Sequence, residues 1–228
     1  MTKPRLSLVA VLIALAAPAA AQNAPTPEEV RVYAGLHEAA AKGDAAEIEK
    51  LIAEGEKPNI QDSRSRTPLL VAAYFHHHAA ARALLKAGAN PNALDLDRYD
   101  IVTIAAVAND IEMLKLALEG GASAKTVTSR YDGTALIAAA HLGNVEAVKI
   151  LIAAKAPLNH VNNLGWTALM EAIVLGNGDR KHIDTVKALV EAGCDVNIAD
   201  RQGVTPLQHA RRRGYSEMAR ILEAAGAR

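Results

Sequence analysis

The stretch Thr67-Pro68-Leu69-Leu70-Val71-Ala72-Ala73 decides the fold of this chain of 228 residues. Threonine followed by proline is typical of a helix start, because the hydroxyl caps free backbone N–H groups and proline suits the first helical position. Closely similar segments recur along the chain, and their leading leucine or valine falls at positions 36, 69, 102, 136, 169 and 207, with steps of 33, 33, 34, 33 and 38 residues. This regular spacing predicts six copies of one structural unit.

A second series of residues marks the place where each unit ends. Its members are Gly55, Gly88, Gly121, Lys155, Gly193 and Gly226, with steps of 33, 33, 34, 38 and 33 residues. Glycine at these places fits the left-handed conformation that often follows a helix. Lys155 is the exception, and we expect it to weaken its helix end by up to about 1 kcal/mol. Together the two series place one added residue before Thr134 and five between Gly176 and Ile183.

The period and the Thr-Pro-Leu-x-x-Ala pattern resemble the ankyrin repeat over about 195 residues, from Tyr33 to Ala227. The resemblance implies an all-α ankyrin-repeat solenoid of about six helix-turn-helix units with projecting β-turn or hairpin loops. The residues give separate reasons for this fold, because small alanines let helices approach closely and paired aliphatic residues supply a core between units. We expect the domain to span residues 33–228, with units at approximately 33–61, 62–94, 95–127, 128–161, 162–199 and 200–228.

Both ends of the array have features of caps. Thr26-Pro27-Glu28-Glu29 predicts a capping box, from which a helix is expected to run from Pro27 to about Ala41. Residues 22–32 would then form a linker and the start of this helix. At the other end, Arg211-Arg212-Arg213 replaces the small residues expected after Ala210 and gives a polar outer face.

Two units depart from the common pattern. The third has Asp100-Ile101 at the place where Thr-Pro occurs elsewhere in the array, so we expect it to be the least stable part of the array. The fifth contains the five-residue insertion, which includes Asp179, Arg180 and His182. We interpret this insertion as a loop, with contact to a partner as the alternative.

The first 21 residues have the three parts of a secretory signal. Lys3 and Arg5 precede an apolar run from Leu6 to Ala17, and small residues follow up to Ala21. The apolar run is too short to span a bilayer, which needs ~20 residues. We therefore expect residues 1–21 to be a cleaved signal peptide of a bacterial protein. The mature chain would be periplasmic, with secretion as the alternative, and would not insert into the membrane.

Composition narrows the classes of partner. Without Lys3 and Arg5 the chain has 23 basic and 25 acidic residues, which does not favour binding to nucleic acid. The only cysteine is Cys194, so no intrachain disulfide can form. We expect it to be buried as a small apolar residue. We also expect the protein to be a monomer.

No recognisable catalytic motif is present, and we expect no enzymatic activity, cofactor or metal. His76-His77-His78 is the sequence feature closest to a metal site. Consecutive residues on a helix point in different directions, so these three cannot chelate one ion together. We expect a turn between helices in which histidine replaces glycine. The alternative is a metal- or redox-responsive binding protein that uses this run, completed by His141, or the thiol of Cys194.

The resemblance implies that a partner protein binds to the projecting turns and the concave face formed by the first helices. Aromatic residues and arginine commonly anchor such interfaces, and five of the seven aromatic residues occupy these positions. The expected function is non-enzymatic protein–protein interaction, although Phe75 and Trp166 could instead be packing residues. The candidate partner-binding residues, in chain order, are Arg64, Arg66, Tyr74, Phe75, Tyr99, Arg130, Tyr131, His141, Leu164, Trp166, Arg201 and Arg212.

Overall fold

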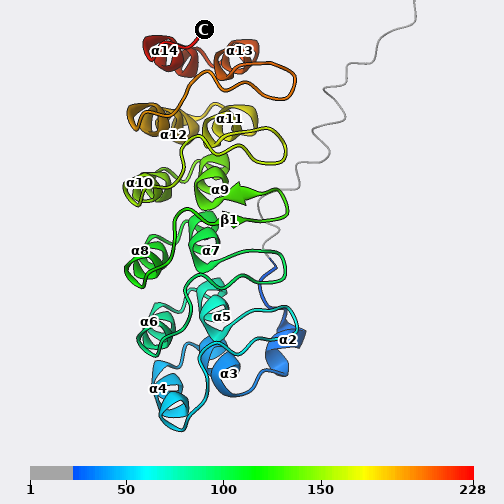
Figure 1. Ribbon diagram of the computed structural model, residues 1–228, viewed down its shortest axis with the longest axis vertical. Helices are drawn as coiled ribbons and strands as arrows, with labels where there is room; N and C mark the ends of the chain where they lie inside the picture. Colours follow the sequence, from blue (N-terminus) through cyan, green and yellow to red (C-terminus); the bar gives the residue numbers. More distant parts are fainter. Residues whose placement is uncertain (1–22) are drawn as a thin grey trace, which may run out of the picture.

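The computed structural model describes residues 23–228, so the expected signal peptide at residues 1–21 lies outside the described residues. The chain forms two columns of helices side by side (Figure 1). The first helices of the units form one column: α3 (Gly35–Lys42), α5 (Pro68–Tyr74), α7 (Ile101–Ala108), α9 (Ala135–Leu142), α11 (Ala168–Val174) and α13 (Pro206–Arg212). The second helices form the other: α4 (Ala45–Ala53), α6 (His78–Lys86), α8 (Ile111–Glu119), α10 (Val145–Ala153), α12 (Arg180–Glu191) and α14 (Ser216–Ala224). The predicted helical solenoid is confirmed.

Most first helices start in the way that the repeated threonine predicts. The hydroxyl oxygen of this threonine accepts a hydrogen bond from the backbone N–H three residues later in α5, α9, α11 and α13. In α7 the carboxylate of Asp100 takes this role and accepts the N–H of Thr103 at 2.8 Å. The predicted capping box of Thr26 and Glu29 is also present. These caps satisfy N–H groups that a helix leaves free at its start.

The unit ends have the predicted left-handed backbone, including the one without glycine. Lys155 has a φ of 60°, where Gly121 of the preceding unit has 91°. A side chain is strained in this region, whereas glycine is not. Lys155 therefore weakens an end that its neighbours form without strain.

Alanine and aliphatic side chains from both columns form one continuous core along the solenoid. Every residue of α5 is buried, because this helix has neighbours on both sides. In α4, at the start of the array, Ile48 alone is buried. Each unit thus buries its apolar side chains mainly against the next unit, as expected of a solenoid.

The N-terminal helix is interrupted, so the expectation of one helix from Pro27 to about Ala41 is wrong. A short helix, α2 (Pro27–Arg31), is separated from α3 by three residues. One of them, Tyr33, donates a hydrogen bond of 2.6 Å from its hydroxyl to the carboxylate of Asp62 in the next unit. This contact holds the chain in a bend that a continuous helix would not allow.

The fourth unit contains a small hairpin in which β1 (Val127–Thr128) pairs antiparallel with β2 (Gly133–Thr134). Val127 lies opposite Thr134, and Thr128 lies opposite Gly133. The repeat spacing indicates one extra residue before Thr134. This residue therefore lengthens a projecting loop. It leaves the helix pair of this unit intact.

Of the residues between Gly176 and Ile183 in the fifth unit, half are helical, so the interpretation of the insertion as a loop is wrong in part. Asp179 caps α12, which has 12 residues where the other second helices have nine. His182 is buried and contacts both Asp179, at 2.7 Å, and the carbonyl oxygen of His141, at 3.0 Å. The insertion therefore adds the buried side chain of His182 to the interior of the solenoid. Within residues 23–228, no helix has the length and apolar character needed to cross a membrane.

Candidate functional site

The loops that precede the first helices project from one side of the solenoid, and we call them finger loops (Figure 1). They comprise residues 62–67 in unit two, 95–100 in unit three, 128–134 in unit four, 162–167 in unit five and 200–205 in unit six. In four of them the first side chain accepts the backbone N–H groups two and four residues later, at 2.8 to 3.0 Å; these residues are Asp62, Asp95, Asn162 and Asp200. The finger loops therefore have a fixed shape before any partner binds.

Adjacent finger loops are also joined to each other by their backbones. Three N–H groups donate to carbonyl oxygens of the preceding loop: Leu96 to Arg64 at 2.8 Å, Ser129 to Arg98 at 3.0 Å, and Asn163 to Tyr131 at 2.9 Å. The loops of units two to five thus form one connected edge. Side chains at their tips are held at fixed relative positions.

The tips of three successive finger loops carry alternating charges. Arg64 contacts Asp97 at 2.6 Å, and Arg130 contacts the same carboxylate at 3.5 Å. The amide of Asn23 donates a third contact to Asp97 at 2.7 Å. The hydrogen bond from Asn23 lowers the pKa of Asp97 and, together with Arg64 and Arg130, outweighs the opposing effect of burial. Asp97 is therefore a charged centre between two arginines.

Large apolar side chains are exposed on the same edge. The exposed fractions are 62% for Leu96, 39% for Tyr131 and 40% for Leu164, which lie in units three, four and five. The guanidinium of Arg130 is 68% exposed beside them. Exposed apolar groups mixed with arginine are typical of surfaces that bind proteins.

Comparison with known proteins agrees with this architecture. The family model described as ankyrin repeats (3 copies) matches residues 36–126 and 102–200, and the one described as ankyrin repeats (many copies) matches residues 179–223. The chain belongs to the ankyrin-repeat family. The ankyrin repeat protein YahD of Escherichia coli K12 is 35% identical over 190 residues, which cover 83% of this chain and 94% of YahD.

Solved ankyrin structures have the same fold. An ankyrin repeat domain from Acinetobacter baumannii AYE has a TM-score of 0.82 and 44% identity, covering 85% of this chain and 98% of that domain. The ankyrin repeat domain of Bcl-3 has a TM-score of 0.76 and 27% identity, covering 86% and 88% of the two chains. Ankyrin repeats are generally non-enzymatic modules of protein–protein interaction.

The ankyrin fold distributes the twelve predicted binding residues over three levels of exposure. Arg130, Tyr131, Leu164, Arg201 and Arg212 are exposed. Arg64, Phe75, Tyr99, His141 and Trp166 are part-buried. Phe75 and Tyr99 pack against the core. The first helices and finger loops of units four to six thus contain all five exposed residues of the set.

Two of the predicted binding residues are buried and do not belong to the exposed surface in this structure. The side chain of Arg66 is only 1% exposed, because it pairs with Asp62 at 2.7 Å and with Glu29 at 2.8 Å. Tyr74 is 9% exposed and donates its hydroxyl to Asp95 at 2.7 Å. Both side chains fasten parts of the ankyrin array to each other.

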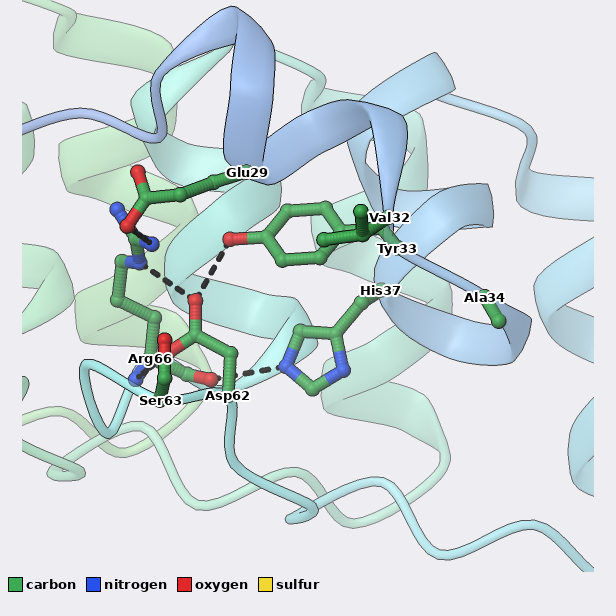
Figure 2. A pocket seen from close by; sticks show the side chains of 8 residues that line it. All are labelled: Glu29, Val32, Tyr33, Ala34, His37, Asp62, Ser63 and Arg66. Atoms are coloured by element: carbon green, nitrogen blue, oxygen red, sulfur yellow. Dashed lines mark hydrogen bonds and ion pairs between the residues drawn. The ribbon is translucent and has the colours of Figure 1, made fainter.

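A cleft of about 320 Å³ lies where the N-terminal segment meets unit two, and Figure 2 shows the side chains that line it: Glu29, Val32, Tyr33, Ala34, His37, Asp62, Ser63 and Arg66. Tyr33 and Arg66 both donate to Asp62, and the ring of His37 contacts the carbonyl oxygen of Arg66 at 2.9 Å. Burial and the contact with Asp62 raise the pKa of Tyr33, so it remains a neutral donor. These polar groups contact one another, so they join the N-terminal segment to unit two.

The histidine run forms the predicted turn between helices. His76 has a left-handed backbone with a φ of 58°, as glycine would have. His76 and His78 both contact the carboxylate of Asp110, at 2.8 and 2.9 Å, while His77 contacts the carbonyl oxygen of Ala41. Across residues 23–228, no three histidine, cysteine or acidic side chains are placed to hold a metal ion.

Cys194 is buried as predicted, with 8% of its surface exposed. Burial, with a smaller contribution from the nearby Asp195, raises the pKa of its thiol to about 11. Since the thiolate is the reactive form, this environment suppresses nucleophilic and redox chemistry.

The sequence did not predict the contacts that the segment before Tyr33 makes with units two and three. Asn23 reaches unit three, Glu29 reaches unit two, and Val32 is 80% exposed beside the cleft. A carboxylate and an arginine that lie 37 residues apart give no local pattern that would predict their pairing. Only the fold brings Glu29 and Arg66 together.

Proposed function

We propose that this ankyrin-repeat protein binds a partner protein through the finger loops and adjoining first helices of units three to six. The observation that carries the proposal is the exposure of Leu96, Tyr131 and Leu164 on three consecutive finger loops of fixed shape. Burial of apolar surface favours association by roughly 25 cal/mol per Å², and a rigid surface loses little conformational freedom on binding.

Charge on this surface favours a partner with acidic groups. Arg130, Arg201 and Arg212 are exposed, whereas the acidic side chains nearby are engaged. Asp132 pairs with Arg98 at 2.9 Å, and Asp200 is buried against His209. Arginines at the edge of an interface steer oppositely charged partners and set orientation.

We assign the aromatic anchors to Tyr131 and Trp166. Tyr131 is exposed at the tip of its loop, and Trp166 is part-buried in the next finger loop. Unlike Phe75, Trp166 is not among the residues packed against the core. Partly exposed aromatic residues of this kind commonly contribute most of the binding energy.

The proposed setting is the bacterial periplasm, with a secreted protein as the alternative. Support comes from the order of basic, apolar and small residues in residues 1–21. The chain would act there as a monomeric binding protein without catalytic activity or cofactor. The buried thiol of Cys194 and the pairing of His76 and His78 with Asp110 do not favour a metal- or redox-responsive role.

Crosslinking in the native compartment, followed by purification of the captured protein, gives the partner for a direct test. We expect Tyr131→Ala combined with Trp166→Ala to weaken its binding by ~2 kcal/mol or more, which is about 30-fold in Kd. Because neither side chain is fully buried, the circular dichroism spectrum and the melting temperature should change little.

Arg82→Ala and Lys149→Ala serve as controls, since both residues are exposed on second helices, away from the finger loops. They should leave the affinity unchanged. Equal affinity of the double variant and the wild type would reject the proposed surface. Loss of affinity in the controls would move the interface to the second helices.

A further inference from the structure

The segment before the first unit lies along the finger loops of units two and three, and we call residues 23–33 the strap (Figure 1). Three contacts hold it. The Asn23 amide donates to Asp97 at 2.7 Å, the Glu29 carboxylate pairs with Arg66 at 2.8 Å, and the Tyr33 hydroxyl donates to Asp62 at 2.6 Å. The strap therefore runs from unit three back to unit one, opposite to the direction of the array.

Polar contacts hold the strap, with little apolar burial. The helix α2 contributes no buried residue, and Pro25 is the one strap residue classed as buried. Val32 is 80% exposed. Segments with few buried apolar contacts open at low free-energy cost, whereas core helices open only with the whole domain.

Release of the strap would not leave a charge without a partner. Arg66 would keep its contact with Asp62, whose carboxylate receives Arg66 Nε at 2.7 Å. Asp97 would keep Arg64 at 2.6 Å. Removal of one member of a buried ion pair is normally costly, and here a second partner remains at both sites. Replacement of the strap by another segment therefore leaves neither Arg66 nor Asp97 without an ion-pair partner.

We propose that the finger loops of units two and three form a peptide-binding surface that the strap occupies in the free protein. A segment of the partner protein that carries an amide and a carboxylate side chain displaces the strap and takes its place on Asp97 and Arg66. This inference rests on the proposed function, because the displacing segment belongs to a partner protein. It adds the finger loop of unit two and the strap-covered part of unit three to the exposed surface on units three to six.

The strap itself defines the chemistry of the segment that would replace it. Arg66 pairs with a carboxylate and also donates to the carbonyl oxygen of Asn23 at 3.3 Å. Asp97 accepts an amide N–H. The recognised segment would present an amide side chain, a few non-helical residues, and then the first turn of a helix with a carboxylate about six residues after the amide, as Asn23 and Glu29 do. Charge-assisted contacts of this kind are strong and directional.

A peptide with the sequence of residues 22–34 provides the probe. It is labelled with fluorescein and titrated with the purified chain that lacks residues 1–21, and fluorescence anisotropy is recorded. The wild-type chain should bind it weakly, because its own strap is present at high effective concentration. Asn23→Ala with Glu29→Ala in the protein should lower the apparent Kd of the wild-type peptide at least about tenfold.

Glu28 supplies the matched control, because its carboxylate pairs only locally, with Arg31 at 2.8 Å. Glu28→Ala in the protein should leave peptide binding as weak as in the wild type. A peptide with the Glu29→Ala change should lose most of its affinity for the double variant, whereas a peptide with Glu28→Ala should keep it. Hydrogen exchange should show faster exchange of residues 26–34 in the double variant, with the core unchanged.

Three results would overturn the proposal. One is the absence of saturable peptide binding to the folded double variant, and another is equal binding of the peptides with Glu29→Ala and Glu28→Ala. The third is a wild-type dimer in light scattering that disappears on Glu29→Ala, which would make a second copy of the chain the occupant. All three leave the effect of Tyr131 and Trp166 on partner binding untouched, so the proposed function can fail or hold separately.

Discussion

The side-chain amide of Asn162 donates a hydrogen bond of 2.9 Å to the buried carboxylate of Glu171. Asn162 shapes the finger loop of unit five by accepting the N–H groups of Leu164 and Trp166, both at 3.0 Å. Glu171 lies in α11 and also contacts the ring of His141 at 3.1 Å. The loop that carries two candidate binding residues is therefore fastened to a first helix of its own unit and, through His141, to the unit before it.

Glu171→Ala should lower the free energy of unfolding by about 2 kcal/mol, because it leaves the Asn162 amide without its acceptor inside the protein. Urea denaturation followed by circular dichroism measures this loss. Glu146→Ala, at an exposed position on α10, is the control and should change stability by less than about 0.5 kcal/mol. Equal stability of the two variants would mean that the contact does not hold the loop.

Lys155→Gly should stabilise the protein by up to about 1 kcal/mol, since it removes a side chain from a left-handed backbone position. The melting temperature would rise accordingly. Lys149→Gly, inside α10, should have the opposite effect and cost about 1 kcal/mol. A loss of stability in both variants would show that the Lys155 side chain makes a larger contribution than its backbone strain.

The thiol of Cys194 should not react with a disulfide reagent in the folded protein near pH 8, because burial raises its pKa to about 11. The same reagent should label one thiol per chain once concentrated urea has unfolded it. Absorbance of the released thiolate measures both rates. Rapid labelling of the folded protein would contradict the buried environment and restore a redox role to consideration.

The contact of Asp110 with His76 and His78 should contribute stability that depends on pH. Burial alone would raise the pKa of Asp110, but the N–H of Met113 and the two histidines outweigh it and hold the pKa below its ordinary value of 3.8. The contribution is therefore present above that value and is lost as the pH falls through the lower pKa of the folded state.

Asp110→Asn keeps the helix cap but removes this charge, so the difference in urea midpoint between wild type and variant should be constant above about pH 5 and should shrink as the pH falls from about 4 towards about 2. Glu112→Gln is the control, because Glu112 is 61% exposed and contacts His78 only at 3.3 Å. A constant difference between wild type and Asp110→Asn over this range would contradict the assignment.

Native-state hydrogen exchange should identify unit three as the least stable part of the array. Its first helix begins with Ile101, where α5 and α13 have proline, so the helix start is less restricted in the unfolded chain. Amides of residues 96–126 should exchange faster than the matching amides of unit two. Slowest exchange in this segment would reject the prediction.

Periodicity predicted most of the fold, because a solenoid repeats the same local interactions in each unit. The threonine caps, the left-handed ends and even the exception at Lys155 follow from short segments of sequence. What the pattern could not predict are contacts between distant segments. The break after α2 combines the contact of Tyr33 with Asp62 and the left-handed backbone of Gly35, whose φ is 54°.

The candidate site was predictable to the extent that a position in the repeat determines exposure. Tyr131 and Leu164 are exposed because the tips of the finger loops project from the solenoid. Arg66 occupies a position that the family resemblance assigns to binding, yet Glu29 of the strap covers it. The inserted segment likewise has no sequence pattern that distinguishes a loop from a helix. In α12, burial of His182 stabilises the helix.

The alternating charges at the tips of the finger loops give the units a fixed order. Arg64, Asp97 and Arg130 occupy the same place in units two, three and four, and each contact joins opposite signs. Excision of unit three would bring Arg64 next to Arg130, and a copied unit three would bring Asp97 next to its own duplicate. The helices of such shuffled arrays would still stack, but side chains of like charge would meet on adjacent finger loops. The units are therefore alike in their core, whereas the charges on their finger loops determine the order in which they can follow one another.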